Sequence, residues 1–427
     1  MAKIRRSLLI LWIRSSIPLW VLILLIALIY LGGVANPNHY TRNLDVLIVD
    51  SDQQLVGQYF TRAFQQSNLG NQTLHWIYGQ SMSIEQVIQE VLRGKVWAAV
   101  YLSAGVTEQV NYVIHSILNA KSSIVNPITY DPVNTVTIVY EEGRNAATYN
   151  GWILPPIRTV LQTLSNQISA YIQSDIAQSS NTFNLYTQLS LIQLADITTS
   201  PIQYTLMNIH PASPYVSQLG TTLGYLFLWL LMVTLVGANV KITRPMAGKI
   251  KIIHIVIFRT LNIILNSLVI SLIYSLCVLW FARIHSHIQF VRLWLFNWLC
   301  AATFSIIIGL FTINLGALAQ FFLTVFLITN LSASTNTIAI ELQPRFYRVG
   351  YGLPLYHAVN GGRHLLVGSH SHFGVDIATL FAYYFACLFF TLLSGIYRMR
   401  KQEQEVKKKA LEKILSSKSK RNKKFFT

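Results

Sequence analysis

The chain has 427 residues, of which 52% are hydrophobic and only 11% are charged, a balance that excludes an ordinary soluble domain. Its formal net charge of +17 would suit a nucleic-acid-binding protein, but three segments carry all of it: residues 1–16, 241–251 and 398–427. These segments flank long apolar stretches, and positive charge in short loops marks the cytoplasmic side of a membrane protein. The basic balance therefore indicates topology, and no nucleic acid is expected as a partner.

The first apolar stretch, residues 17–34, follows the basic N-terminus of residues 1–16 and precedes Asn36-Pro37. Gly33 and Ala35 resemble a small-residue cleavage site. However, the 18 apolar residues of this stretch exceed the roughly 7–15 that are typical of a cleaved signal. We therefore expect a retained first transmembrane helix with a cytoplasmic N-terminus.

Residues 35–217 form a mostly polar block with more acidic than basic residues and no cysteine. β-Branched runs predict strands at residues 44–50, 97–102 and 135–140. Apolar spacing of the helical kind follows at residues 54–64 and again from Ala146 to about Leu194, with an interruption at Pro155-Pro156. A block of this size is large enough for its own core, so we expect an extracytoplasmic α+β domain.

This block offers few candidate sites. Asp45, Asp50 and Asp52 cluster at the end of the first predicted strand, where carboxylates could bind a cation or act in acid–base chemistry. Chain-reversal chemistry is the favoured interpretation of Asp50-Ser51-Asp52. Asn71 begins an Asn-X-Thr sequon and is a candidate glycosylation site. No glycine-rich phosphate loop is present, so the chain carries no recognisable ATPase.

Residues 218–397 predict a five-helix membrane domain. The expected spans are near residues 219–240 and 260–282, two within 293–340, and one at 377–397. The 48 residues from Leu293 to Ile340 contain no charge, and one helix of that length would reach ~70 Å, more than twice a bilayer core. We therefore expect a turn near Asn314-Leu315-Gly316, although a re-entrant segment would also fit.

The full expectation is a polytopic α-helical membrane protein with about six transmembrane helices and both termini in the cytoplasm. The large α+β extracytoplasmic domain would lie between the first and second helices. Cys277, Cys300 and Cys387 all lie in apolar stretches without metal-binding spacing, which is typical of small core residues. For Arg259, near the inner end of the third span, snorkelling to the interface is the favoured interpretation, with an anionic headgroup contact as the alternative.

The basic cytoplasmic tail, residues 398–427, places Val406 and Ile414 on one helical face together with Ala410 and Leu411. Lysines occupy the remaining positions of this predicted helix. That pattern favours an amphipathic helix on an anionic membrane surface, with a solvated helix as the alternative.

The loop before the last span, residues 344–368, is rich in aromatic residues and glycine, which is typical of a helix at the membrane interface. Guanidinium groups bind phosphate in a bidentate manner, so this loop supplies candidate lipid or substrate contacts: Arg345, Arg348, Tyr351, Tyr356 and Arg363. Ion pairing of the arginines with Glu341 is the alternative.

Histidines are frequent in this loop and in one shorter loop. The set is His357, His364, His370 and His372, with His285 and His287 in the shorter loop. No carboxylate or cysteine joins them at the usual spacing, so we expect no metal site.

The same loop resembles the fungal nitrosoguanidine-resistance membrane proteins. The matching positions are Tyr347, Arg348, Gly350, Tyr351, Pro354, Tyr356, Arg363 and Gly368. The segments Val49-Asp50-Ser51-Asp52 with Val56-Gly57, and Glu142-Gly143-Arg144-Asn145 with Ile153-Leu154-Pro155, are similar to further parts of that family. His357 and His364 depart from the family pattern.

The resemblance implies a membrane domain similar to ABC-2-type exporters and phage-infection proteins, with one span, a large external domain and five further spans. It also implies a fungal plasma-membrane protein that contributes to resistance against toxic compounds and is linked to phospholipid distribution between leaflets.

From these observations we expect a membrane protein that supports resistance to toxic small molecules, by export or by affecting phospholipid distribution across the plasma membrane. The alternative is a non-transporting scaffold or regulator that binds partners through its external domain. No enzyme activity is expected, because no nucleophile–base pair stands out, and no cofactor is expected. Expected partners are membrane lipids, a separate ATPase or another membrane protein, and further copies of the chain. Other secretory-pathway membranes are compatible with the same pattern.

Overall fold

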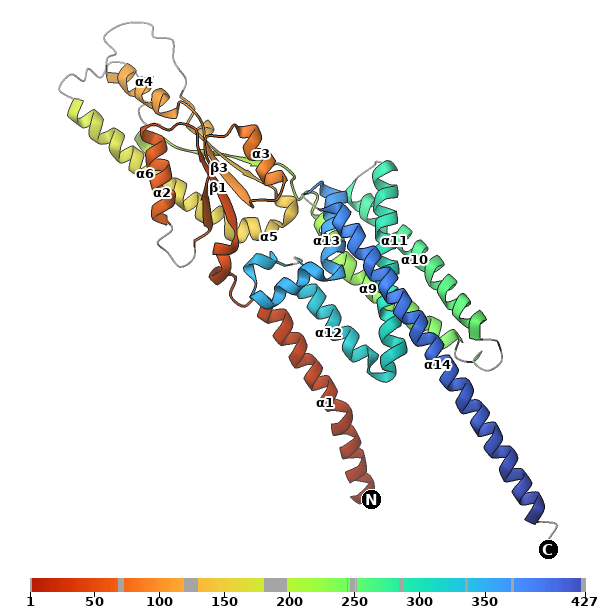
Figure 1. Ribbon diagram of the computed structural model, residues 1–427. Helices are drawn as coiled ribbons and strands as arrows, with labels where there is room; N and C mark the ends of the chain where they lie inside the picture. The colour runs from red at the N-terminus through yellow and green to blue at the C-terminus, as the bar shows by residue number, and fades with distance from the viewer. Residues whose placement is uncertain are drawn as a thin grey trace. The chain divides into compact units, whose positions relative to one another are not determined.

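The computed structural model describes residues 2–67, 73–118, 130–179, 198–243, 245, 250, 252–283, 287–334, 337–369 and 372–423 (Figure 1). The chain divides into two compact units. We call Leu28–Gln218 with Ser332–His372 the sheet unit, and Met1–Ala27, Leu219–Leu331 and Phe373–Thr427 the helical unit.

The sheet unit contains a five-stranded mixed sheet of order β2-β1-β3-β4-β5. Its strands are β1 (Asp45–Asp50), β2 (His75–Tyr78), β3 (Ala98–Leu102), β4 (Val136–Tyr140) and β5 (Tyr204–Asn208). The β3–β4 pair is antiparallel and the other neighbours are parallel. The three strands predicted from β-branched runs are confirmed as β1, β3 and β4, and the sheet gains β2 and β5, which the sequence did not indicate.

Alternate residues of the strands face two apolar layers, as the period of two in a strand requires. Val46, Ile48 and Val100 pack in one layer with residues of α2 (Leu55–Ser67), α4 (Val106–Leu118) and α6 (Leu154–Ser179). Leu47, Val49 and Ala99 pack in the other layer with residues of α3 (Ile84–Leu92). Helices therefore cover both faces, and the first strand is buried on both sides, as its unbroken apolar run suggests.

The interruption expected at Pro155-Pro156 does not break the helix. α5 (Ala146–Thr148) leads into a π-helical turn, Tyr149–Ile153, and then into α6. The N–H of Leu154 is donated to the carbonyl of Tyr149, one residue further back than in an α-helix. Proline lacks an N–H and crowds the preceding turn, and the wider turn accommodates it. Residues 180–194 of the expected helix lie outside the described residues.

Within the sheet unit, residues 332–372 pack against residues 28–218. They contain three short or irregular helices: η8 (Ile340–Leu342), η9 (Arg345–Gly352) and α13 (Pro354–Val367). Ile338, Ala339 and Leu342 belong to the core of the sheet unit, and the Ala339 N–H donates to Thr148 Oγ1 at 2.9 Å. The sequence did not indicate this packing. From the sequence, the same residues are predicted to be the end of a span and an interfacial loop.

The remaining helices contain the long apolar stretches of the chain. They are α1 (Ala2–Gly33), α8 (Tyr215–Thr221), α9 (Leu223–Thr243), α10 (Ile252–Ala282), α11 (His287–Leu315), α12 (Ala319–Ser332) and α14 (Phe373–Lys423). Among the described residues there are five candidate spans: Ser16–Gly33, Tyr215–Thr243, His254–Ala282, Gln289–Ser332 and Phe373–Gly395. The protein is therefore a multi-pass membrane protein by its candidate spans.

The count of five differs from the expected six because α11 and α12 form one 44-residue candidate. The predicted turn is confirmed: α11 ends at Leu315, and Gly316 has a φ of +54°, a conformation that glycine adopts without steric cost. α12 has only 14 residues, so it rises ~21 Å, short of a ~30 Å bilayer core.

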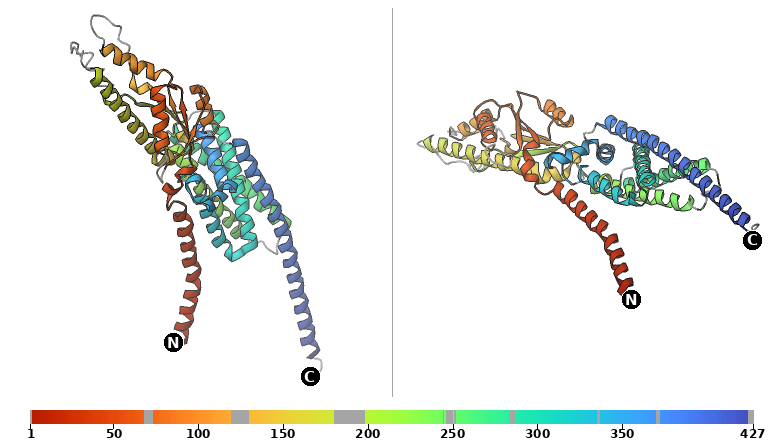
Figure 2. Two further views of the ribbon diagram at one scale, coloured as in Figure 1. Left: turned by 60° about the vertical axis from the view of Figure 1, so that its left-hand side comes forward. Right: turned by 60° about the horizontal axis from the view of Figure 1, so that its bottom comes forward.

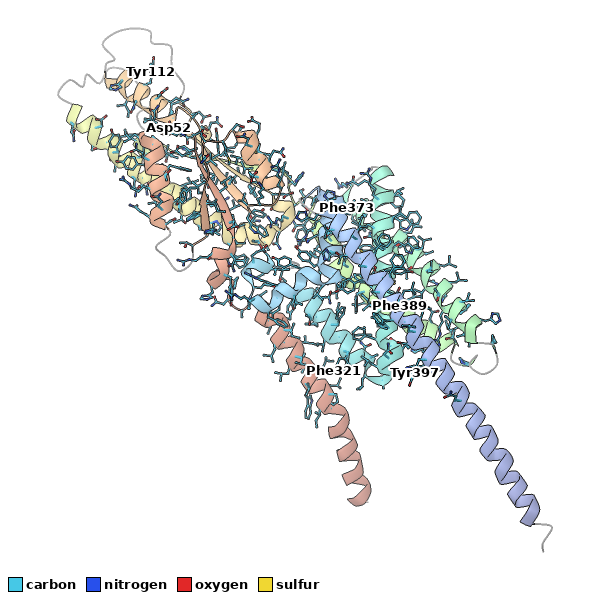
Figure 3. The ribbon with its side chains drawn as sticks, viewed as in Figure 1. Asp52, Tyr112, Phe321, Phe373, Phe389 and Tyr397 are labelled. Carbon is cyan, nitrogen blue, oxygen red and sulfur yellow. The ribbon has the colours of Figure 1, made fainter. Side chains whose placement is uncertain are left out.

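The last helix continues well beyond the membrane-length stretch. α14 runs for 51 residues from Phe373 to Lys423, and Figure 2 shows it as one helix toward the C-terminus. Phe389 and Tyr397 on this helix are 59% and 69% exposed (Figure 3), as expected for side chains that face lipid. The side chains of Val406 and Ile414 lie outside the described ones, so the amphipathic tail remains a prediction.

Candidate functional site

The predicted cluster of three aspartates is wrong for Asp45, which begins β1, whereas Asp50 ends the strand and Asp52 follows it. Asp52 is buried between the starts of α2 and α4 (Figure 3). Its carboxylate accepts the N–H of Thr107 at 2.9 Å and the hydroxyl of Thr107 at 2.5 Å. Asp50 accepts the N–H of Asp52 at 3.0 Å, and Asp45 pairs with His75 at 2.7 Å. The contacts of Asp50 and Asp52 are the turn and capping chemistry that the sequence favoured, whereas the Asp45–His75 contact joins β1 to β2.

The segment η9 packs against the end of the first candidate span. The hydroxyl of Tyr347 donates to the carbonyl of Ile29 at 2.5 Å. A Cβ atom on Gly33 would lie 3.2 Å from the Tyr347 ring, and one on Gly350 would lie 1.9 Å from the carbonyl oxygen of Ala333. η9 is therefore held at the level where the apolar run of α1 ends, which is the level of the headgroups if α1 spans the bilayer.

The outer side of η9 combines positive and apolar side chains, which we call the η9 surface: Arg345, Phe346, Arg348, Val349 and Tyr351, all of them exposed. Phe346 is 63% exposed. Neither Arg345 nor Arg348 has an acidic group within 4.0 Å among the described residues. Ion pairing of these two with Glu341 is therefore not observed in that part of the chain.

Glu341 interacts with a tyrosine of the η9 surface instead. The side chain of Tyr351 is hydrogen-bonded to Glu341, and burial together with this negative charge raises the pKa of the Tyr351 phenol. Tyr356 is half-buried, and its ring lies edge-on to that of Tyr351 with 5.3 Å between centroids. The two predicted tyrosines are thus brought together.

Arg363, the third predicted arginine, is placed differently. It is only 7% exposed, and its Nη1 donates to the carbonyl of Arg144 at 2.8 Å. Burial lowers the pKa of Arg363 to about 10, so the guanidinium keeps its charge at neutral pH. Arg144 in turn stacks over the Trp97 ring, 3.6 Å from its centroid. Arg363 ties α13 to the sheet and is not part of the η9 surface.

A contact between a buried carboxylate and an imidazole completes the polar interior of the sheet unit. Glu141 is fully buried and lies 2.8 Å from His210 Nδ1. The carbonyl of His210 accepts the N–H of Gly143 at 2.8 Å. Sequence reasoning missed this pair, because 69 residues separate its members and neither stands in a motif.

The histidines of the last loop interact with backbone. His357 Nε2 is 3.0 Å from the carbonyl of Tyr351, and His364 Nδ1 is 3.1 Å from that of Ser369. Within the described part of the chain no three His, Cys, Asp or Glu side chains group as metal ligands do. His370 and the candidate glycosylation site Asn71 lie outside that part.

The helical unit contains buried polar contacts that the sequence reading also missed. Tyr225 on α9 donates to Asn297 Oδ1 on α11 at 2.9 Å, and Asn297 Nδ2 donates to Ser275 Oγ on α10 at 2.8 Å. Ser267, Ser271 and Ser275 are all fully buried. Their spacing of four residues puts them on one face of a helix, a signal that was readable in the sequence.

A second polar group joins α9 and α10 near the end of α9. Arg259 Nε donates to Thr243 Oγ1 at 2.7 Å. Asn262 Nδ2 donates to Asn239 Oδ1, and Asn266 Nδ2 donates to Asn262 Oδ1 at 2.7 Å. Arg259 is thus held by the neighbouring helix, and the amides of Asn262 and Asn266 extend the polar contact along α10.

Comparison with known proteins gives a family but no activity. None of the curated proteins compared matches the chain significantly. The family model described as "Protein of unknown function (DUF3533)" matches residues 15–398, a range that includes every candidate span and the whole sheet unit. The chain therefore belongs to the DUF3533 family.

Proposed function

We propose that this protein contacts and redistributes phospholipids, and that it supports resistance to toxic small molecules by affecting the distribution of phospholipids across the plasma membrane. The observation that carries the proposal is the η9 surface. Two arginines without acidic partners among the described residues, Arg345 and Arg348, stand beside exposed Phe346 and Val349. This segment is held at the end of the first candidate span by Tyr347.

The chemistry of that surface fits a lipid headgroup. The planar guanidinium group binds phosphate through two parallel N–H donors. Aromatic side chains favour the headgroup layer, where one part of the ring is apolar and another is wet. The arginines would hold the phosphate while Phe346 and Val349 enter the acyl boundary.

The proposal includes a finer topology. α11 and α12 would cross as separate passes, giving six crossings, with the sheet unit outside the cell and both basic termini in the cytoplasm. The positive residues of segments 1–16 and 398–427 support this orientation. The resemblance to nitrosoguanidine-resistance proteins, and through them to ABC-2-type exporters, supports resistance as the outcome.

The direct test is phospholipid translocation in proteoliposomes that contain only the purified full-length protein. We expect protein-dependent movement of a fluorescent phospholipid, reduced at least fivefold by the double variant Arg345→Gln, Arg348→Gln. The matched control is Arg62→Gln, Arg158→Gln, which removes the same charge from exposed positions on α2 and α6. The control should behave as the parent protein.

Two results would contradict the proposal. Unchanged movement in the Arg345, Arg348 variant would remove the η9 surface as the headgroup contact. No movement by the parent protein would favour the alternative, a non-transporting scaffold or regulator, or a requirement for a separate ATPase.

A further inference from the structure

The α9–α10 seam, which we define as Asn239, Thr243, Arg259, Asn262 and Asn266, carries unusual chemistry for an apolar span. Asn239 and Thr243 are each 1% exposed. Arg259 lies five residues into the candidate span His254–Ala282, so it is ~7 Å from the start of that span. A charged group at this depth is expensive and is typically functional.

The seam has more hydrogen-bond donors than acceptors. Asn239 Nδ2 is buried and has no partner among the described residues. The one contact that the described residues give to Arg259 uses its Nε atom, and a guanidinium has five N–H donors. No acidic side chain lies within 4.0 Å of Arg259 in that part of the chain. An acceptor-only, negatively charged partner would satisfy these remaining donors.

We propose that the α9–α10 seam binds the phosphate group of a phospholipid. The phosphate of a phospholipid, whether the diester of most headgroups or the monoester of phosphatidic acid, presents anionic acceptor oxygens that match the fork of Arg259. Asn239 Nδ2 adds a further donor within the seam. A carboxylate of the protein is absent at this position among the described residues, so the negative charge comes from a ligand.

The neighbouring side chains favour a lipid over a free anion. Arg259 and Asn262 are half-buried, so the seam is open to the lateral surface of α10. Leu261 and Leu265 beside them are 54% and 60% exposed. A headgroup at Arg259 would place its acyl chains against these leucines, whereas a free phosphate ion would have to enter an apolar span without any compensating apolar contact.

The seam also reaches deeper into the span. Asn266 is exposed and lies seven residues beyond Arg259, which corresponds to ~10 Å along α10. Hydrogen bonds link it to Arg259 through Asn262, Asn239 and Thr243, whose hydroxyl donates to the Asn239 carbonyl at 2.6 Å. A headgroup that leaves Arg259 would therefore meet polar partners toward the middle of the bilayer. This last step rests on the proposed function, but the binding site does not.

The test measures binding to the full-length protein in detergent micelles, with fluorescent phosphatidic acid as the probe. We expect Arg259→Gln to weaken binding at least tenfold. The affinity of Arg259→Lys should lie between those of Arg259→Gln and the parent protein, because an ammonium group keeps the charge but lacks the bidentate fork. Asn239→Leu should weaken binding severalfold. The matched control is Arg283→Gln, an exposed arginine just beyond the other end of α10, which should bind as the parent protein.

A second readout keeps the test valid if a variant is less stable. Phosphatidic acid should raise the unfolding temperature of the parent protein and of Arg283→Gln, because a ligand that binds only the folded state stabilises it. It should not raise that of Arg259→Gln. Diacylglycerol, which lacks the phosphate, should compete with the probe more than tenfold less well than phosphatidic acid, and so should inorganic phosphate, which lacks the acyl chains.

Three outcomes would overturn the inference: equal binding by Arg259→Gln and the parent protein, an equal loss in Arg283→Gln, or competition by inorganic phosphate as effective as by phosphatidic acid. The last result would mean a simple anion site. If the parent protein binds phosphatidic acid through Arg259 but moves no phospholipid in proteoliposomes, that result would contradict the proposed function and leave this binding site in place.

Discussion

At the scale of single residues, the glycines of the resemblance motifs are explained by close approach of other atoms. A Cβ atom on Gly57 would lie 2.4 Å from the Asp50 carboxylate, and one on Gly143 would lie 3.0 Å from Val367. Real Cβ contacts are longer than the first of these distances, so a methyl group at Gly57 would displace the Asp50 carboxylate from the N–H groups of Asp52 and Gln53. These glycines in the motifs are therefore explained by packing. The sequence motif alone does not distinguish a packing role from a binding role.

Gly350 gives the sharpest test of this explanation. A Cβ atom there would meet the carbonyl oxygen of Ala333 at 1.9 Å, whereas one on Gly352 would meet nothing within 4 Å. We expect Gly350→Ala to destabilise the protein by about 3 kcal/mol, at the upper end of overpacking effects. Gly352→Ala is the control in the same helix. Thermal unfolding of the two variants in detergent measures the difference, and equal unfolding temperatures would show that the backbone at Ala333 yields.

The buried phenol of Tyr149 should make the free energy of unfolding decrease at alkaline pH. Its hydroxyl is buried and donates to the carbonyl of Trp97 at 2.7 Å, and burial raises the pKa of the phenol above its usual value of 10.0. Because the folded state holds this proton more tightly than the unfolded state, the resulting stability is present below about pH 10 and declines as the pH rises through the folded pKa.

The corresponding measurement compares unfolding of the parent protein and Tyr149→Phe between pH 8 and pH 11. At pH 8 the variant should be about 1 kcal/mol less stable, because it leaves the Trp97 carbonyl without this donor. Above pH 10 the gap should narrow, because phenylalanine has no proton to lose in either state. A gap that is constant with pH would contradict the assignment.

At the scale of elements, the sequence predicts those strands and helices whose signal is local. β1, β3 and β4 carry β-branched runs, and the turn at Gly316 follows from the length limit of a membrane span. β2 has only four residues, although Trp, Ile and Tyr among them favour strands, and β5 reads Tyr-Thr-Leu-Met-Asn, which has no β-branched run. The backbone hydrogen bonds of β2 with β1 and of β5 with β4 stabilise these two strands in the folded protein.

The packing of residues 332–372 was not predictable for a related reason. Ala339 and Thr148, which form one of its anchoring hydrogen bonds, are 191 residues apart. The sequence identifies Arg345, Arg348 and Arg363 equally well as basic residues of one loop. Only the folded structure separates the exposed pair from Arg363, which is buried against the carbonyl of Arg144.

Asn297 tests the coupling of three helices. It accepts from Tyr225 on α9 and donates to Ser275 on α10, and in an apolar environment such contacts contribute about 0.6–2 kcal/mol each. We expect Asn297→Leu to lower the unfolding temperature in detergent by several degrees. The control is Asn314→Leu, since the Asn314 amide bonds within its own helix to the Leu310 carbonyl. Equal effects of the two changes would argue against an inter-helix role.

At the scale of the whole molecule, charge and helix length make opposing statements about topology. Residues 1–16 and 398–427 are both strongly basic, which favours the same side of the membrane for both ends. An even number of crossings satisfies this condition, whereas five candidate spans do not. The conflict is concentrated in α12, whose 14 residues correspond to ~21 Å.

Six crossings require the short helix α12 to span the bilayer. This is possible if the bilayer thins locally or if polar side chains at the ends of α12 reach to its surface, and each adjustment has a modest energetic cost. A single cysteine placed at each terminus tests this, after replacement of Cys277, Cys300 and Cys387 by alanine. We expect Ser7→Cys and Ser419→Cys to react with a membrane-impermeant maleimide from the same side, the cytoplasmic one. Gln65→Cys, an exposed position on α2, should react from the opposite side. Reaction of Ser7→Cys and Ser419→Cys from opposite sides would contradict six crossings, because only an odd number of passes separates the two ends of a chain.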